Sequence, residues 1–98
     1  DAVDQIKAQG FKIYANTQPH LWPWQFSFLE GSPWRDIRVR KAANLCLNRS
    51  ELKSYLGGYM SEATGVYEEG NPWRGKPTFQ IKYDPDSARK LMSEAGYS

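Results

Sequence analysis

The residues that could perform covalent chemistry are few and widely spaced. Nucleophilic catalysis needs a nucleophile, a base and a group that orients the base, and the single histidine, His20, has no serine or cysteine placed to suggest such a triad. The single cysteine, Cys46, falls on the apolar stripe of an expected helix, where a buried, inert thiol is the usual outcome. The sequence therefore predicts no catalytic residue and a protein that is not an enzyme.

Metal and cofactor sites are not indicated either. One cysteine and one histidine cannot supply the four ligands of a Cys/His zinc framework. The acids at 68–69 are expected to be solvated loop residues, and Asp84 and Asp86 are explained by helix capping. Gly57-Gly58 lacks the sequence context of a phosphate-binding loop. The sequence predicts neither a metal nor a cofactor.

An aromatic run is the strongest candidate for a binding surface. An alternating pattern from His20 to Glu30 predicts a strand, and one face of it would carry Trp22, Trp24, Phe26 and Phe28. Exposed rings can stack on sugars, peptide side chains or bases, whereas inward rings form core. We expect the two phenylalanines to pack, while both roles stay open for Trp22 and Trp24. Trp34 and Trp73, each directly after a proline, are expected to anchor loops.

Short strands and several helices must position these residues. The expected elements are a helix over Ala2 to Gln9 capped at Gly10, a strand over Phe11 to Tyr14, the strand from His20 to Glu30, a helix from Asp36 to about Leu47, a helix that starts at Asn48 and stops at Gly57-Gly58, a long ordered loop over 59–83, and a helix from Asp84-Pro85-Asp86 to Gly96. The stripe expected to be buried on the fourth of these elements comprises Ile37 or Val39, Ala42, Ala43, Cys46 and Leu47. This pattern predicts an α/β fold. Two strands alone are marginal in water, so residues 1–98 are expected to be a single segment of a larger domain.

Composition and charge exclude several classes of protein. With 40% hydrophobic, 14% aromatic and 24% charged residues, the 98-residue chain is not of the disordered type. Its apolar runs are all shorter than the roughly 18 residues that a bilayer crossing needs. The net charge is +2, with a local +4 over 35–53 from six basic and two acidic residues, which is too small an excess to predict nucleic-acid binding. The chain opens on Asp1 without a secretory leader, which predicts a mature product or an excised piece.

Several spaced motifs resemble one protein family. Residues 32–42, Ser-Pro-Trp-Arg-Asp-Ile-Arg-Val-Arg-Lys-Ala, are similar to a signature of the family 5 extracellular solute-binding proteins, the peptide, nickel and opine receptors of ABC importers. The resemblance continues through Leu47-Asn48-Arg49, Gly57-Gly58 and Ala63-Thr64-Gly65, and ends with Tyr83-Asp84-Pro85-Asp86, Ala88, Leu91 and Glu94-Ala95-Gly96-Tyr97. It covers about residues 20 to 98. Departures are Asn48 where the family usually has Asp, Met92 for Leu, and 21–25 in place of a Tyr-rich strand.

The resemblance implies a function and a location. The full protein would be a two-lobed α/β binding protein of the type II periplasmic fold that closes on a peptide or another small solute, and this chain would be a section of one lobe. It would deliver the solute to an ABC permease and its ATPase, and it would be periplasmic, or lipid-anchored on the extracellular face in a Gram-positive host. Any membrane contact would pass through the permease or through an anchor outside this segment.

The same resemblance places candidate ligand contacts on the aromatic strand. In family members the strand that matches 21–28 passes beside the ligand cavity, which makes Trp22, Trp24 and Gln25 the candidate contacts by position. Arg38 and Arg40 of the signature are expected to form structural ion pairs rather than ligand contacts.

Another interpretation remains open from the sequence. The chain could be a stand-alone interaction module that binds carbohydrate or nucleic acid through its aromatic strand and basic helix. A steep salt dependence of binding would favour the nucleic-acid version.

Overall fold

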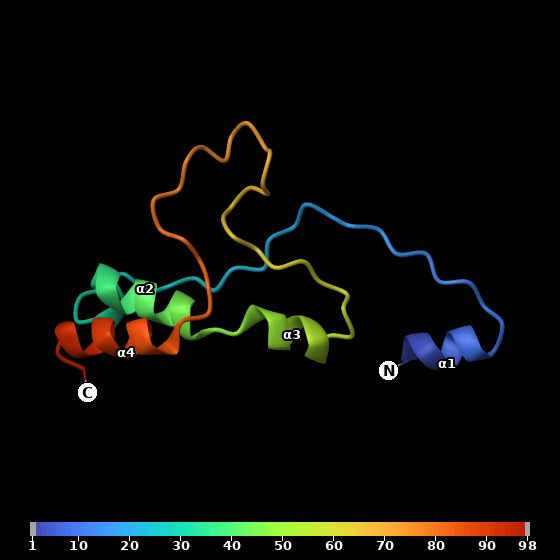
Figure 1. Cartoon of the computed structure of the whole chain (residues 1–98), viewed down its shortest axis with the longest axis horizontal. Helices are drawn as coiled ribbons and strands as arrows, with labels where there is room; N and C mark the ends of the chain where they lie inside the picture. The colour runs from blue at the N-terminus through green and yellow to red at the C-terminus, as the bar shows by residue number, and fades with distance from the viewer. Residues whose placement is uncertain (1, 98) are drawn as a thin grey trace.

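The computed structural model describes residues 2–97, and within that range it contains four α-helices and one 3-10 helix (Figure 1). The elements are α1 (Ala2–Ala8), the 3-10 helix η1 (Pro33–Arg35), α2 (Ile37–Cys46), α3 (Arg49–Tyr55) and α4 (Pro85–Glu94). All four helical segments expected from the sequence are confirmed. Asp1, from which a mature or excised chain was inferred, and Ser98 lie outside the described residues.

Polar side chains fix where three of these helices begin. The Asp36 carboxylate accepts a hydrogen bond from the backbone N–H of Arg38, 2.8 Å away, at the start of α2. Asn48 and Asp84 act in the same way at the starts of α3 and α4. Each cap satisfies one of the amides that a helix leaves free at its first turn. The predicted starts are therefore correct and have the predicted cause.

Glycines end the first and last helices by a shared geometry. Gly10 has φ of 87° and Gly96 has φ of 89°, a left-handed conformation that costs glycine little. The following residue then donates its N–H back into the last turn, Phe11 to the carbonyl of Ile6 and Tyr97 to that of Met92. Both glycines are the helix stops that the sequence predicts.

The core of the described chain lies between α2 and α4, which pack side by side (Figure 1). Its buried residues are Val39, Ala42, Leu45 and Ala88, with Phe79, Leu91 and Met92 partly buried against them. Ala42 and Ala88 have minimal side chains, which lets the two helix backbones approach closely. The core is therefore small and built from two helices.

The buried stripe of α2 differs from the prediction at its end. Val39 and Ala42 are buried as expected, but Leu45 takes the place expected for Cys46, and Ile37 is exposed. The buried residues Val39, Ala42 and Leu45 are spaced three apart and form one line along α2. Cys46 follows Leu45 directly, and because successive helical residues are turned by about 100°, its thiol points away from that line. The prediction of a core cysteine is wrong for this structure, and the Cys46 sulfur contacts the carbonyl of Ala43 instead.

The two expected strands are not confirmed. Residues 11–14 and 20–30 run as irregular chain, apart from a turn at the end of the second segment, and no strand occurs between residues 2 and 97. A strand is stable only when its N–H and C=O groups pair with a neighbouring strand. Neither segment has such a neighbour here, so the α/β detail of the predicted fold has no counterpart in the isolated chain.

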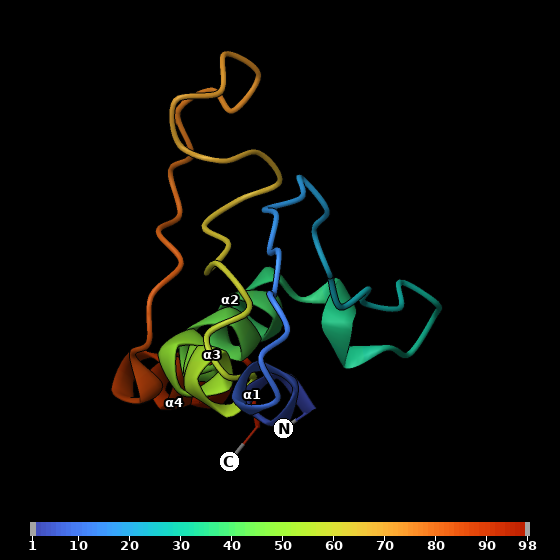
Figure 2. The same ribbon diagram turned by 90° about the vertical axis from the view of Figure 1, so that its right-hand side faces the viewer.

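The chain is expanded for its size. Its radius of gyration is 17.6 Å, whereas a compact domain of this length has about 13 Å. Its accessible surface of 8680 Å² likewise exceeds the roughly 5,700 Å² typical of a folded monomer of this mass. Figure 2 shows the loop of residues 59–83 standing clear of the helices, and α1 and α3 pack against no other described helix. None of the helices within residues 2–97 combines the length and apolarity that a bilayer crossing requires.

Candidate ligand-binding surface

The three predicted contact residues lie on one exposed, irregular stretch of chain. Trp22 is 94% exposed, Trp24 is 77% exposed, and the Gln25 side chain is also exposed. All three belong to residues 22–28, which we call the aromatic segment. They come before Phe26, where this segment becomes attached to the rest of the molecule. The structure places the three residues next to one another and outside the larger of its two described cavities.

Phe26 is the first residue of the aromatic segment that is anchored. Its ring stacks on that of Trp34 in η1, with 4.5 Å between the ring centroids and an angle of 16° between the planes. The Ser32 hydroxyl strengthens this attachment, since it donates to the carbonyl of Ser27 at 2.7 Å and accepts from the N–H of Trp34 at 3.3 Å. The predictions that Phe26 packs and that Trp34 anchors a loop are confirmed.

Phe28, two residues further along the aromatic segment, is held by Arg40 of α2. The guanidinium carbon lies 5.0 Å from the centroid of the Phe28 ring, within the range of a cation–π contact. Nη1 of Arg40 also donates to the carbonyls of Trp34 and Arg35, at 2.7 and 3.0 Å. Phe28 nevertheless remains 61% exposed, so the packing expected for it is a contact with a cation at the surface.

Arg38 points away from this surface and forms the ion pair predicted for it. Its guanidinium binds both carboxylate oxygens of Asp36, and the Nη2–Oδ2 distance is 2.6 Å. The hydrogen bonds from the Arg38 side chain and backbone lower the pKa of Asp36 to about 2. For Arg40 the expected ion pair is not observed among the described residues, and its guanidinium donates to backbone carbonyls instead. Residues two apart on a helix differ by about 200° in direction, so the two arginines serve opposite sides of α2.

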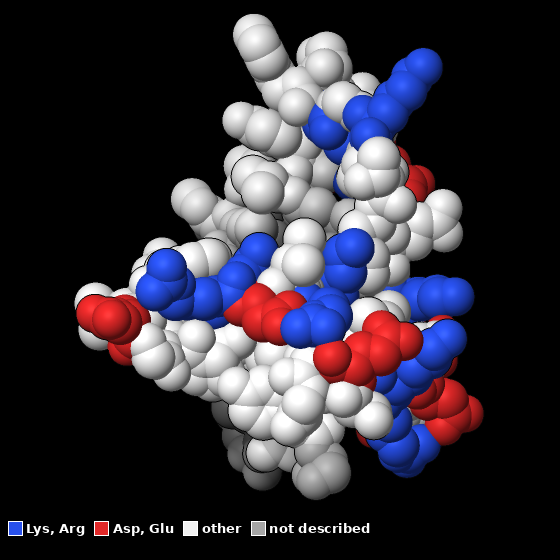
Figure 3. All heavy atoms as spheres, turned by 90° about the vertical axis from the view of Figure 1, so that its left-hand side faces the viewer, with Lys and Arg blue, Asp and Glu red and all other residues white. Residues whose placement is uncertain are grey.

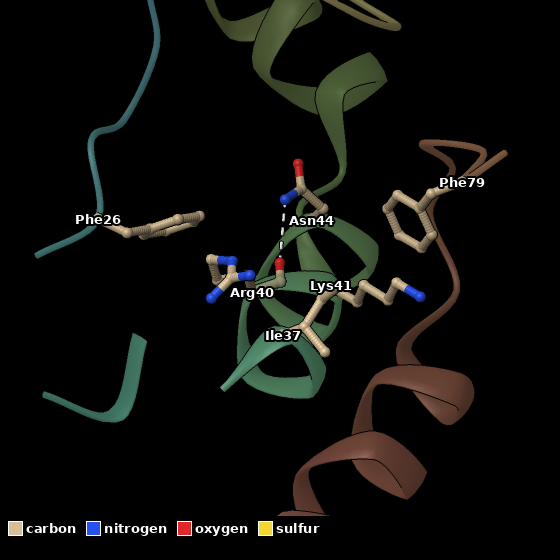
Figure 4. A pocket seen from close by; sticks show the side chains of 6 residues that line it. All are labelled: Phe26, Ile37, Arg40, Lys41, Asn44 and Phe79. Carbon is tan, nitrogen blue, oxygen red and sulfur yellow. Dashed lines mark hydrogen bonds between the residues drawn. The ribbon is translucent and has the colours of Figure 1, made fainter. Parts of the chain in front are cut away.

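An open cavity of about 290 Å³ lies where the aromatic segment meets α2 (Figure 4). It is lined by Phe26, Ile37, Arg40, Lys41, Asn44 and Phe79. Figure 4 shows Phe26 and Phe79 on opposite sides of α2, with the Lys41 chain directed toward Phe79. The side-chain amide of Asn44 already has hydrogen-bond partners: its nitrogen donates to the carbonyl of Arg40, and its oxygen accepts from Arg49. Sequence reasoning missed this cavity because its walls come from segments far apart in the chain.

Charge is mixed over the surface beside the helix pair. Figure 3 shows Lys and Arg interleaved with Asp and Glu across this face, without a broad field of one sign. No group of three or more His, Cys, Asp or Glu arranged to hold a metal ion occurs in residues 2–97. The site residues thus offer stacking surfaces and amide hydrogen bonds, which suit recognition of a small organic solute.

Comparison with known proteins matches residues 1–98 to the bacterial extracellular solute-binding proteins, family 5 Middle. Similar individual proteins include the glutathione-binding protein GsiB of Escherichia coli (strain K12), of Salmonella typhi and of Shigella boydii serotype 4. Each is 37% identical over an alignment of 73 positions, and the match covers 66% of this chain and 13% of the relative. The chain therefore spans a small fraction of the length of these relatives. No solved structure matches it significantly.

Proposed function

The chain belongs to the bacterial extracellular solute-binding proteins, family 5, and on that premise we propose that it is a section of one lobe of a two-lobed protein that captures a small solute for an ABC importer. The observation that carries this proposal is the family match across residues 1–98. The similarity to glutathione-binding proteins supports it.

The excess surface of the chain supports a place inside a larger lobe. About 3,000 Å² more is exposed than a folded monomer of this mass presents, and much of it is apolar. Exposed large hydrophobic residues occur on the aromatic segment, on α3 and on the long loop, for example Phe28, Tyr55 and Val66. In the full-length protein the remaining chain covers most of this surface.

The segments that lack partners fit the α/β fold of such a lobe. Residues 11–14 and 20–30 have alternating sequence patterns and run as irregular chain without a ladder. In the full-length protein they pair with strands supplied by the remaining chain. Pro23 interrupts hydrogen bonding at the entry of the second strand, which suits a position at a sheet edge beside a cavity.

The proposed ligand is a peptide or a similar small solute, and glutathione, a tripeptide, is the first compound to test. Trp22 and Trp24 present flat apolar faces that stack on peptide side chains and backbone. The Gln25 amide can both donate to and accept from a peptide bond. Trp22, Trp24 and Gln25 are therefore the proposed contacts contributed by this segment.

Capture requires no bond to be made or broken. Two lobes that close around the solute bury its surface, and the closed form is then recognised by a permease with its ATPase. The protein acts in the periplasm, or at the extracellular face through a lipid anchor outside this segment. The alternative of a stand-alone carbohydrate- or nucleic-acid-binding module is not favoured by the family match, and the mixed charge in Figure 3 does not favour nucleic acid.

The direct test is calorimetric titration of the full-length protein with glutathione and with a panel of di- and tripeptides. The proposal expects saturable binding of one ligand per protein at micromolar or lower concentration. Failure of every peptide and of glutathione, alongside saturable binding of an oligosaccharide or oligonucleotide, would replace it with the module interpretation.

A further inference from the structure

The aromatic segment divides into an anchored half and a free half. Phe26 and Phe28 are held by Trp34 and Arg40, whereas Trp22 and Trp24 project without a comparable attachment. The division falls directly beside Gln25. Whatever fixes the anchored half therefore limits where the free half can lie.

We infer that Arg40, with Trp34 as its partner, is a positioning residue that holds the aromatic segment in place for ligand binding. This inference rests on the proposed function, since it assigns a role relative to the proposed contacts at 22–25. Neither Arg40 nor Trp34 is expected to touch the ligand.

The geometry makes Arg40 a junction of three structural pieces. Its backbone belongs to α2, its Nη1 group donates to the carbonyls of Trp34 and Arg35 in η1, and its guanidinium carbon lies over the ring of Phe28. A guanidinium is planar and offers several donors, so it can hold two carbonyls and stack on a ring at once. Movement of η1 relative to α2 would break both carbonyl contacts, and movement of the aromatic segment would break the contact with the Phe28 ring.

Trp34 supplies the second point of attachment. Because its carbonyl accepts from Arg40 while its ring stacks on Phe26, the same residue links α2 to the aromatic segment. Two contacts, at Phe26 and Phe28, restrain both the position and the twist of this stretch of chain, which a single contact would not. Trp24 lies two residues before Phe26, so its place depends on where Phe26 is held.

The test measures amide hydrogen exchange and glutathione binding in the full-length protein and its variants. Arg40→Ala and Trp34→Ala are expected to speed exchange over residues 22–29 by about tenfold, while exchange over 85–94 in α4 stays unchanged. Trp34→Phe, which keeps a stacking ring, is expected to stay near the unmodified protein. Arg89→Ala is the matched control, because Arg89 pairs with the exposed Asp86 on α4 and contacts none of these groups.

Glutathione affinity gives the second readout. Arg40→Ala is expected to weaken binding by about tenfold at a temperature where the variant remains folded, and Arg89→Ala is expected to leave it unchanged. If Arg40→Ala does not fold, Trp34→Ala and Trp34→Phe carry the same comparison.

The two proposals fail in different ways. Exchange over 22–29 that does not change, or that rises only together with exchange in α2 and α4, would overturn the positioning role and leave an ordinary structural arginine. If the unmodified protein binds neither glutathione nor any tested peptide, the proposed ligand class fails, and the exchange data still decide the role of Arg40.

Discussion

The guanidinium of Arg38 donates a hydrogen bond to the backbone carbonyl of Glu94, 2.6 Å away and 56 residues further along the chain. This contact joins the first turn of α2 to the last turn of α4. At the other end of the pair, the N–H of Asp84 donates to the carbonyl of Leu45 at 2.8 Å. The two helices are antiparallel and are therefore fixed at both ends, with the buried alanines and Leu45 between.

Loss of the Arg38 contact should loosen the helix pair. Arg38→Ala removes both the ion pair with Asp36 and the bond to the Glu94 carbonyl, so we expect the helical signal of the isolated chain to melt a few degrees lower. Circular dichroism during heating measures this. The control is Arg89→Ala, which removes only an exposed pair within α4 and should shift melting much less. Equal shifts in the two variants would contradict a tertiary role for Arg38.

The stability of the helix pair should fall in acid. The pKa of Asp36 is lowered to about 2 in the folded chain from an ordinary value of 3.8, so this carboxylate stabilises the fold above about pH 4, and the contribution is lost as the pH falls through about 2. Hydrogen bonds from Ser87 lower the pKa of Asp84, which acts in the same direction. Asp36→Asn should flatten part of this acid-induced loss of helicity. An unaltered acid profile in that variant would show that Asp36 does not carry the effect.

Removal of one tryptophan ring should weaken ligand binding selectively. Trp24→Ala is expected to reduce the affinity of the full-length protein for glutathione or a bound peptide by roughly tenfold, because a stacking surface is lost. Trp73→Ala is a closely matched control: Trp73 also follows a proline and is 80% exposed, against 77% for Trp24. Isothermal titration calorimetry measures the ligand affinity of the two variants. Equal losses of affinity would remove the case for a contact at 22–25.

The isolated 98-residue chain should be partly folded and should bind ligand poorly. Small-angle scattering should give a radius of gyration nearer to 17.6 Å than to the roughly 13 Å of a compact domain, because α2 and α4 are the only helices of residues 2–97 that pack into a core. Closure around a ligand needs the second lobe, so titration with peptides should show only weak binding. Micromolar or tighter binding by the isolated chain would contradict a fragmentary site.

The helices could be predicted from the sequence because local signals determine their ends. Asp36, Asn48 and Asp84 cap the helices that follow them, and Gly96 ends the last one. Cys46 was misplaced because a helical stripe is about three residues wide, and only the direction of α4 decides which residues in it are buried. That direction depends on the whole tertiary structure.

The strands and the site were less accessible to sequence reasoning. An alternating pattern marks 20–30 as able to form a strand, but pairing needs a partner strand, and residues 2–97 contain none. The aromatic run drew attention to Trp22 and Trp24, whereas the roles of Arg40 and Ser32 emerged only from the structure. The contacts of Arg40 and Ser32 depend on where η1 lies relative to α2 and the aromatic segment. The sequence Pro33-Trp34 predicted a turn at this point but not its position.

The central claim is that this chain is part of a protein that captures a small solute, and native mass spectrometry of the full-length protein purified from the envelope of its own host tests it most directly. A closed binding protein retains its ligand through gentle purification. The account predicts a species heavier than the polypeptide by the mass of one peptide-sized solute, which denaturation releases. A protein absent from the envelope, with only its bare polypeptide mass and no binding of added peptides, would contradict the account.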